Sequence, residues 1–365
     1  MRRSVALAAI AVAVAGAGAP LASGAREHRL AGWPRMALAM SGANVVYSTS
    51  GATRIAAGGY TIYRSDTFTL RMNRTGLRSA RRQPGIVLRT SAGPTTAGQL
   101  SGDATGRYVL VATGKGFAPQ VVFCCRRNLK DYPVEASGRA GAPVTLTAAL
   151  QGPVVRYVVA NADGTVDLAT RYVKDGPGFT SRDVRPLAAS PIGNLISSAP
   201  GIVGWVDRTA PGEVRLAVTL PGDPEPYPQP AIPVPGSVKR IVVTPYVVVA
   251  LVRVGRQYRL IRYDVPDWHP TVVWRGITRP GPIAAGDRTI VIATGSVVRQ
   301  HVPGQTLRTV FRLRGRAVAL ATDGTRVAVL ERLRTRTRRK AIRQSAITVV
   351  PVRQPPPAYG LERHR

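Results

Sequence analysis

The 365-residue sequence contains only two cysteines, Cys124 and Cys125, and they are adjacent. No disulfide can therefore join distant parts of the chain, so burial of apolar surface must hold the fold together. A bond between neighbours would strain the intervening peptide, because ordinary bridge geometry needs more widely separated Cα atoms. A redox-labile bonded pair and two unpaired thiols both stay open. No metal site and no cofactor is expected, because further ligands at suitable spacing are missing.

Acidic residues are also scarce. The chain has 51 Lys and Arg against 19 Asp and Glu, a net charge of +32 and a pI near 11.6. A GC-rich genome would favour Arg over Lys, but it does not explain the shortage of Asp and Glu. The other interpretation is that the protein works against a polyanion, such as an anionic envelope polymer, an acidic lipid surface or nucleic acid. The charge alone does not decide between them.

Aromatic residues make up only 6% of the chain and are not interleaved with its arginine runs. This removes the stacking platform expected of single-strand nucleic-acid binders, so nucleic acid is a disfavoured partner. The G-x-S-x-G, H-E-x-x-H and P-loop motifs are absent. His269 lies beside Asp264, Asp267 and Trp268, and we interpret that segment as a polar loop with a packed Trp rather than an acid–base or metal corner. No catalytic residue is assigned, and an enzyme is the less favoured class.

Long apolar runs are missing except near the N-terminus. Arg2 and Arg3 precede the apolar run Val5 to Val14, and small residues follow, as in a secretory signal. The sequence predicts a cleaved signal over residues 1–25 and a secreted or envelope-associated protein without a transmembrane span after cleavage. An uncleaved anchor is the alternative. Residues 26–35 are predicted to be a linker, and the Pro-rich tail 353–365 to be extended and exposed.

What the sequence does contain is a repeated β pattern. The clearest unit, Val238 to Gly276, holds four short apolar runs in about 40 residues, the size of a propeller blade. Its second run, Val247 to Val252, is continuous and β-branched, which is typical of a strand buried on both faces.

A turn followed by a strand recurs through the chain at spacings of 64, 46, 49, 44, 41 and 38 residues. The seven turns begin at Gly42, Gly106, Gly152, Gly201, Pro245, Gly286 and Gly324. The sequence therefore predicts an all-β fold, a single β-propeller over residues 36–352 with seven four-stranded blades, and six or eight blades also fit the spacing. Two β-sandwiches are the poorer alternative. The last strand, Ala346 to Val352, is expected to close the ring by pairing near Met36 to Met40 or Val45 to Ser48.

Two segments carry a family resemblance. Residues Leu100 to Leu110, with Ser101, Asp103 and Gly106-Arg107-Tyr108-Val109, resemble the "S-x-D-G-R-Y-V" start of TolB-like and WD40-like propeller repeats. Residues Ala321 to Val329 resemble it more closely, because in the first segment two residues are inserted between Asp and Gly. The resemblance implies a scaffold fold and no fixed activity.

Two arginine-rich clusters are the candidate polyanion-binding residues. The denser one lies between the last two predicted strands and is expected to be a long exposed hairpin loop; it comprises Arg332, Arg334, Arg336, Arg338, Arg339, Lys340 and Arg343. The other lies in an enlarged loop of the first blade and comprises Arg78, Arg81 and Arg82.

The function predicted from these features is an exported, non-enzymatic β-propeller that binds an envelope component or an exported protein at one face of the ring. One alternative is a propeller-type enzyme, a lactonase or a cofactor-dependent dehydrogenase, with its site in the central funnel. Inward-pointing carboxylates or histidines from several blades would mark that class, and the sequence has few acidic residues to supply them. The other alternative is a basic protein that charge alone retains on anionic envelope polymers.

Overall fold

Every regular element that the structure describes is a β-strand, and every described strand pair is antiparallel. The structure is a computed structural model. It describes residues 26–31, 36–42, 44–49, 55–57, 60–73, 76–82, 86–89, 99–102, 108–112, 120–123, 131–133, 144–173, 182–219, 225–265, 267–336 and 341–352, and between 48 and 143 it describes the backbone only. No helix in this part of the chain is long and apolar enough to cross a membrane.

The described strands form seven sheets, and the first three follow the N-terminal half of the chain. The first sheet contains β2 (Met36–Ser41), β3 (Asn44–Thr49), β4 (Ile55–Ala57), β5 (Tyr60–Asn73), β6 (Gly76–Arg82) and β7 (Ile86–Arg89). The second contains β8 (Gln99–Gly102), β9 (Tyr108–Ala112), β10 (Gln120–Phe123) and β11 (Asp131–Pro133). The third contains β12 (Val144–Gln151), β13 (Val154–Ala160), β14 (Val166–Tyr172) and β15 (Asp183–Pro186).

The remaining four sheets follow in chain order, and only the last draws a strand from elsewhere. The fourth contains β16 (Pro191–Ala199), β17 (Ile202–Asp207), β18 (Glu213–Val218), β19 (Tyr227–Pro228) and β20 (Ile232–Pro233). The fifth contains β21 (Ser237–Val243), β22 (Val247–Val254), β23 (Gln257–Asp264) and β24 (Pro270–Gly276). The sixth contains β25 (Ile283–Gly286), β26 (Thr289–Thr294), β27 (Val297–His301) and β28 (Arg308–Arg312). The seventh contains β29 (Arg316–Thr322), β30 (Arg326–Arg336), β31 (Ala341–Pro351) and β1 (Arg26–Ala31).

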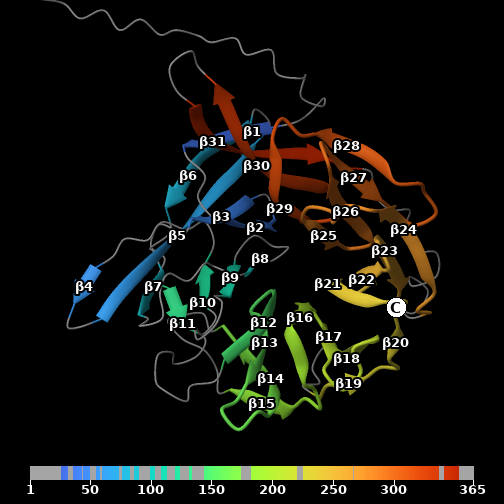
Figure 1. Cartoon of the computed structure of the whole chain (residues 1–365). Helices are drawn as coiled ribbons and strands as arrows, with labels where there is room; N and C mark the ends of the chain where they lie inside the picture. Colours follow the sequence, from blue (N-terminus) through green and yellow to red (C-terminus); the bar gives the residue numbers. More distant parts are fainter. Residues whose placement is uncertain are drawn as a thin grey trace, which may run out of the picture.

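These sheets are the blades of a β-propeller. The first strand of each sheet contacts the first strand of the next, in the order β2, β8, β12, β16, β21, β25, β29 and back to β2. Those strands are therefore innermost, and the sheets follow one another around a ring (Figure 1). The predicted all-β propeller is confirmed, and the described residues form seven sheets.

The predicted repeat corresponds to one strand position in every sheet. Each of the seven turns named above lies just before a second strand, namely β3, β9, β13, β17, β22, β26 and β30. The run Val247 to Val252 in β22 is at most 2% exposed along its whole length, which confirms a strand buried on both faces. Continuous β-branched residues fit this position because apolar surface covers the strand from both sides.

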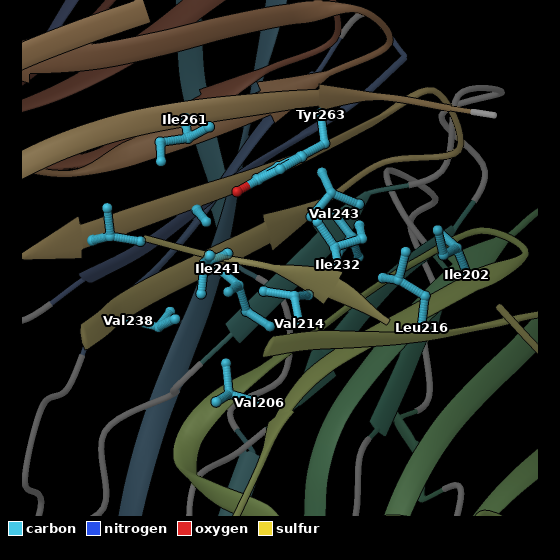
Figure 2. Packing of buried hydrophobic residues seen from close by; sticks show 14 residues of the cluster. Ile202, Val206, Val214, Leu216, Ile232, Val238, Ile241, Val243, Ile261 and Tyr263 are labelled. Atoms are coloured by element: carbon cyan, nitrogen blue, oxygen red, sulfur yellow. The ribbon is translucent and has the colours of Figure 1, made fainter. Parts of the chain in front are cut away.

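The hydrophobic core is divided among the interfaces between neighbouring blades. One cluster joins β17, β18 and β20 to β21, β22 and β23, with Leu216, Ile241 and Ile261 among its members (Figure 2). On the other side of the same blade, Val249 and Leu251 pack with Ile290 and Ile292. A blade on its own would expose both faces, so each blade depends on its two neighbours for stability.

Side chains of one blade also hold the turn of the next. Thr244 Oγ1 donates to the Asp287 carbonyl at 2.9 Å, and Thr289 Oγ1 donates to the Gly324 carbonyl at 3.4 Å. Arg326 Nη2 donates to the Gly42 carbonyl at 3.0 Å. The bonds run in one direction around three successive interfaces. They satisfy turn carbonyls that dense packing would otherwise leave unpaired.

The strand that closes the ring differs from the one expected. β31 pairs with β1, from Arg26 opposite Val349 to Ala31 opposite Gln344. The predicted partners, Met36 to Met40 and Val45 to Ser48, instead form β2 and β3 of the next blade. Residues 26–31 of the segment interpreted as a linker over 26–35 thus supply the fourth strand of the last blade, and residues 32–35 lie outside the described residues. The composition of residues 26–31 concealed this, because Arg26, Glu27 and Arg29 are polar residues on an outermost strand.

Candidate anion-binding face

Basic residues gather on one face of the last three blades. In a blade of four antiparallel strands, the connections alternate between the two ends of the strands. We consider the three blades that begin with β21, β25 and β29. On one side of these blades the chain connects the second strand of a blade to its third strand, and the fourth strand to the next blade. We call this side the basic face. Its described basic residues are Lys239, Arg240, Arg253, Arg256, Arg275, Arg279, Arg312, Arg314, Arg316 and Arg332.

Most arginines of the basic face are exposed and carry no carboxylate partner. The exposed ones are Arg240, Arg253, Arg256, Arg275, Arg279, Arg312 and Arg316. Among the described residues, none of these seven forms an ion pair, whereas Arg262, Arg314 and Arg326 of the same blades do. Their summed charge therefore faces solvent without local neutralisation, which raises the concentration of anions near this surface.

The described aspartates of the same blades lie at the opposite ends of the strands, whereas Glu331 and Glu27 of the last blade pair with Arg314. Asp264 and Asp267 belong to the connection after β23, and Asp287 and Asp323 to the turns before β26 and β30. Asp323 and Asp264 are each paired with an arginine on that side, Arg326 and Arg262. The three blades are thus electrostatically one-sided.

Arg314 is the exception on the basic face, because it is used in the fold. Its Nη1 lies 2.8 Å from Glu27 Oε2 and its Nη2 lies 3.4 Å from Glu331 Oε2, and Glu331 is fully buried. Burial alone would raise the pKa of Glu27, but hydrogen bonds from Arg29 and Arg314 outweigh it and hold this pKa below its ordinary value. Arg314 thereby fastens β1 to the last blade.

The denser predicted cluster lies mostly on strands, not in a long loop. β30 carries Arg332, Arg334 and Arg336, and its ladder with β31 continues until Arg336 lies opposite Ala341. Arg338, Arg339 and Lys340 lie outside the described residues. The charge density suggested a loop, but the basic residues alternate with others such as Leu333, which is 8% exposed. Alternation places the arginines on one face of a strand and lets the ladder extend.

The second predicted cluster is also on a strand. Arg78, Arg81 and Arg82 belong to β6, where they lie opposite Arg71, Thr69 and Phe68 of β5. The segment predicted to be an enlarged loop of the first blade therefore contains an additional strand, β6, which pairs with β5. The predicted outer strand Ile86 to Arg89 is present as β7. Ladder hydrogen bonds to β5 satisfy the backbone of β6 despite its polar composition.

The two predicted clusters come from opposite ends of the chain and meet at the ring closure. β6 contacts β1, and β1 pairs with β31, which carries Arg343 opposite Arg334 (Figure 1). Like charges directly opposite each other in a ladder are in general destabilising.

The other residues singled out in the sequence are the cysteine pair and the segment around His269. Cys124 and Cys125 lie outside the described residues, directly after β10. His269 is exposed, Asp264 is paired with Arg262, and Trp268 packs against the core cluster of Figure 2, so the interpretation as a polar loop with a packed Trp holds. In the part of the chain that the structure describes, no three His, Cys, Asp or Glu side chains are grouped to hold a metal.

Most residues of the basic face were not predicted from the sequence. The arginines at its turns flank glycines, as in Arg253-Val254-Gly255-Arg256 and Arg312-Leu313-Arg314-Gly315-Arg316. This recurrence was the available signal, although the turn between β26 and β27, Gly295-Ser296, carries no arginine. It is weak when read along the chain, because about 20 residues separate one group from the next and only the blade topology puts them on one side.

No protein-family model and no curated protein matches the chain. Solved structures that it resembles include PorZ, a surface component of the type-IX secretion system of Porphyromonas gingivalis (10% identity, 83% of this chain and 36% of that one, TM-score 0.46). Another is the Cps50 (Swd1) β-propeller domain of Myceliophteria thermophila (12% identity, 87% and 100%, TM-score 0.43). A third is the aldose sugar dehydrogenase of Streptomyces coelicolor (14% identity, 66% and 91%, TM-score 0.40). Enzymes and non-enzymatic propellers both occur in this group, and the topology of the chain itself is what establishes its fold.

Proposed function

We propose that the protein is an exported β-propeller that binds an anionic polymer of the cell envelope through its basic face. The observation that carries this proposal is the set of seven exposed arginines without an ion-pair partner among the described residues. Export rests on the signal-like residues 1–25. The arginine-rich hairpin of β30 and β31, with β6 beside β1, extends the same charge to the ring closure.

Coding bias would raise arginine content without regard to position. In these three blades, however, the seven exposed arginines without an ion-pair partner lie at one end of the strands and the described aspartates at the other. A positively charged surface attracts a linear polyanion, and contact between them releases the counter-ions of the polyanion. No described grouping of carboxylates or histidines favours the alternative of an enzyme with a central site.

Binding to immobilised polyglutamate and to polyphosphate over a salt series tests the proposal. We expect retention that falls steeply as salt rises, because counter-ion release drives the association. The variant Arg253→Gln/Arg275→Gln should lower the slope of log K against log salt by about 2, one for each lost contact.

The matched control is Arg288→Gln/Arg308→Gln, which removes the same charge at the opposite ends of the strands. An equal loss in both double variants would show that net charge alone retains the protein. Absence of binding to either polymer would overturn the proposal and leave an exported protein as the partner to seek.

A further inference from the structure

Two arginines of the basic face belong to elements that adjoin at the inner rim of the ring. Arg240 is on β21, an innermost strand, and Arg279 is in the connection that leads to β25, the innermost strand of the next blade. Backbone bonds between Gly281 and Ala293 and between Ala293 and Pro282 anchor that connection to β26.

A β-bulge sets the direction of Arg240. The register of β21 on β22 shifts between Val238 and Arg240, so one extra residue is inserted there. From Arg240 onward the strand alternates, which puts Arg240 and Val242 on one face. Val242 packs against the core cluster that this blade shares with Ile283 and Ile292 of the next, so this face looks toward the blade that Arg279 introduces.

The two side chains are mutually repulsive and otherwise unpartnered. Arg240 and Arg279 are both exposed, and neither forms a hydrogen bond or ion pair through its side chain with any described residue. Burial among the surrounding residues lowers the pKa of Arg240, and the charge of Arg279 lowers it further. A guanidinium that is reached by solvent, partly desolvated and next to a like charge has an unmet requirement for an anion.

We propose that Arg240 and Arg279 together bind a single oxyanion, a carboxylate or phosphate group, at the inner rim of the basic face. Two guanidinium groups offer paired N–H donors that match the oxygens of such a group. This inference rests on the proposed function, and names the place at which one charged group of the polymer is held. It distinguishes a defined site from retention by charge alone.

Inorganic phosphate and acetate are the probes, each compared with chloride at equal ionic strength. In the full mature protein we expect phosphate or acetate, but not chloride, to raise the melting temperature and to give a saturable heat of binding in calorimetry. The variant Arg240→Gln/Arg279→Gln should weaken binding of that anion by about tenfold or more, which corresponds to ~1.4 kcal/mol. Which of the two probes binds identifies the polymer's charged group.

The matched control is Arg256→Gln/Arg275→Gln, two exposed arginines of the same face. Loss of anion binding in the test variant alone supports the site. Equal weakening in both variants, or no anion-dependent stabilisation of the unchanged protein, overturns it. If the double variant folds poorly, anion binding is measured on Arg279→Gln alone, which changes one exposed residue in a connection.

Polymer retention of the same variants separates this inference from the proposed function. If the protein holds polyphosphate or polyglutamate while no small anion binds at Arg240 and Arg279, the pair is not a site but the basic face still binds polymer. If small anions bind and neither polymer does, the pair is a site and the proposed function is wrong.

Discussion

Arg326 donates a hydrogen bond from Nη2 to the backbone carbonyl of Gly42, 3.0 Å away, and thereby joins residues 284 positions apart. Its Nε also donates to Asp323 Oδ2 at 2.9 Å, which fixes the guanidinium over the turn. The bond links the last blade to the first on the side opposite the basic face. β1 secures the same closure within the last blade, so two independent devices hold the ring.

Replacing Arg326 by Ala should lower the free energy of unfolding by ~1–3 kcal/mol, because a charge-assisted bond is lost and the Gly42 carbonyl loses a donor. Denaturant unfolding followed by tryptophan fluorescence measures this. Arg316→Ala, at an exposed position of the same blade, serves as control and should change stability by less than ~0.5 kcal/mol. Equal effects would show that Arg326 does not secure the closure.

Removal of β1 should open the ring. A chain that begins at residue 32 leaves β31 as an uncovered edge and leaves Arg314 without Glu27. Exposed edges pair with other chains, so we expect aggregates or dimers in size-exclusion chromatography. A chain that begins at residue 26 should remain monomeric under the same conditions. A monomeric, stable chain without residues 26–31 would contradict the role assigned to β1.

Asp264 compensates a buried charge. Arg262 is 1% exposed, forms a two-pronged ion pair with Asp264 and donates from Nη1 to the Arg288 carbonyl at 2.7 Å. Asp264→Asn should cost up to ~3–5 kcal/mol, because it leaves the guanidinium buried and unpaired. The double variant Arg262→Met/Asp264→Asn should be more stable than Asp264→Asn alone. A simple sum of the single effects in denaturant unfolding would rule out this coupling.

His301 makes stability depend on pH in mildly acidic solution. Burial and, to a smaller extent, the charge of Arg262 lower the pKa of His301 to about 4, although Asp264 acts in the opposite direction. In the unfolded chain the ordinary value is 6.5. The unfolded state therefore binds a proton first, and stability should fall as pH drops from 6.5 to 4, by ~3 kcal/mol in total, and level off below.

His301→Gln should flatten the stability profile between pH 6.5 and 4, as measured by denaturant unfolding at each pH. His269→Gln, at an exposed position, should leave the profile unchanged. If the slope persists in His301→Gln, protonation of another group causes it.

Asp207 makes the stability of the fold depend on pH in more acidic solution than His301 does. Burial alone would raise its pKa, but hydrogen bonds from the Ser190 and Thr209 amides, the Thr209 hydroxyl and the Trp205 indole outweigh burial and hold the pKa at about 2. Its contribution of ~2 kcal/mol is present above the ordinary value of 3.8 and is lost as pH falls toward 2. Asp207→Asn should remove that part of the acid unfolding profile and leave the His301 window intact.

The sequence by itself determined the propeller. Strand length, β-branched runs and turn glycines are local properties, so the seven turns and the buried strand at Val247 to Val252 could be predicted from neighbouring residues. Its seven repeats correspond to the seven second strands that the structure describes.

Only the tertiary structure decided how distant segments meet. β1 is polar, so nothing local shows that it pairs with β31, and the partner lies more than 300 residues away in the chain. Likewise, repulsion between basic residues suggested a loop at Arg332 to Arg343, but the ladder of β30 and β31 extends into this segment. Arg240 and Arg279 became neighbours only through a bulge in one blade and the start of the next. Local sequence fixes which residues form strands, whereas the shared face on which charges gather depends on the packing of blades around the ring.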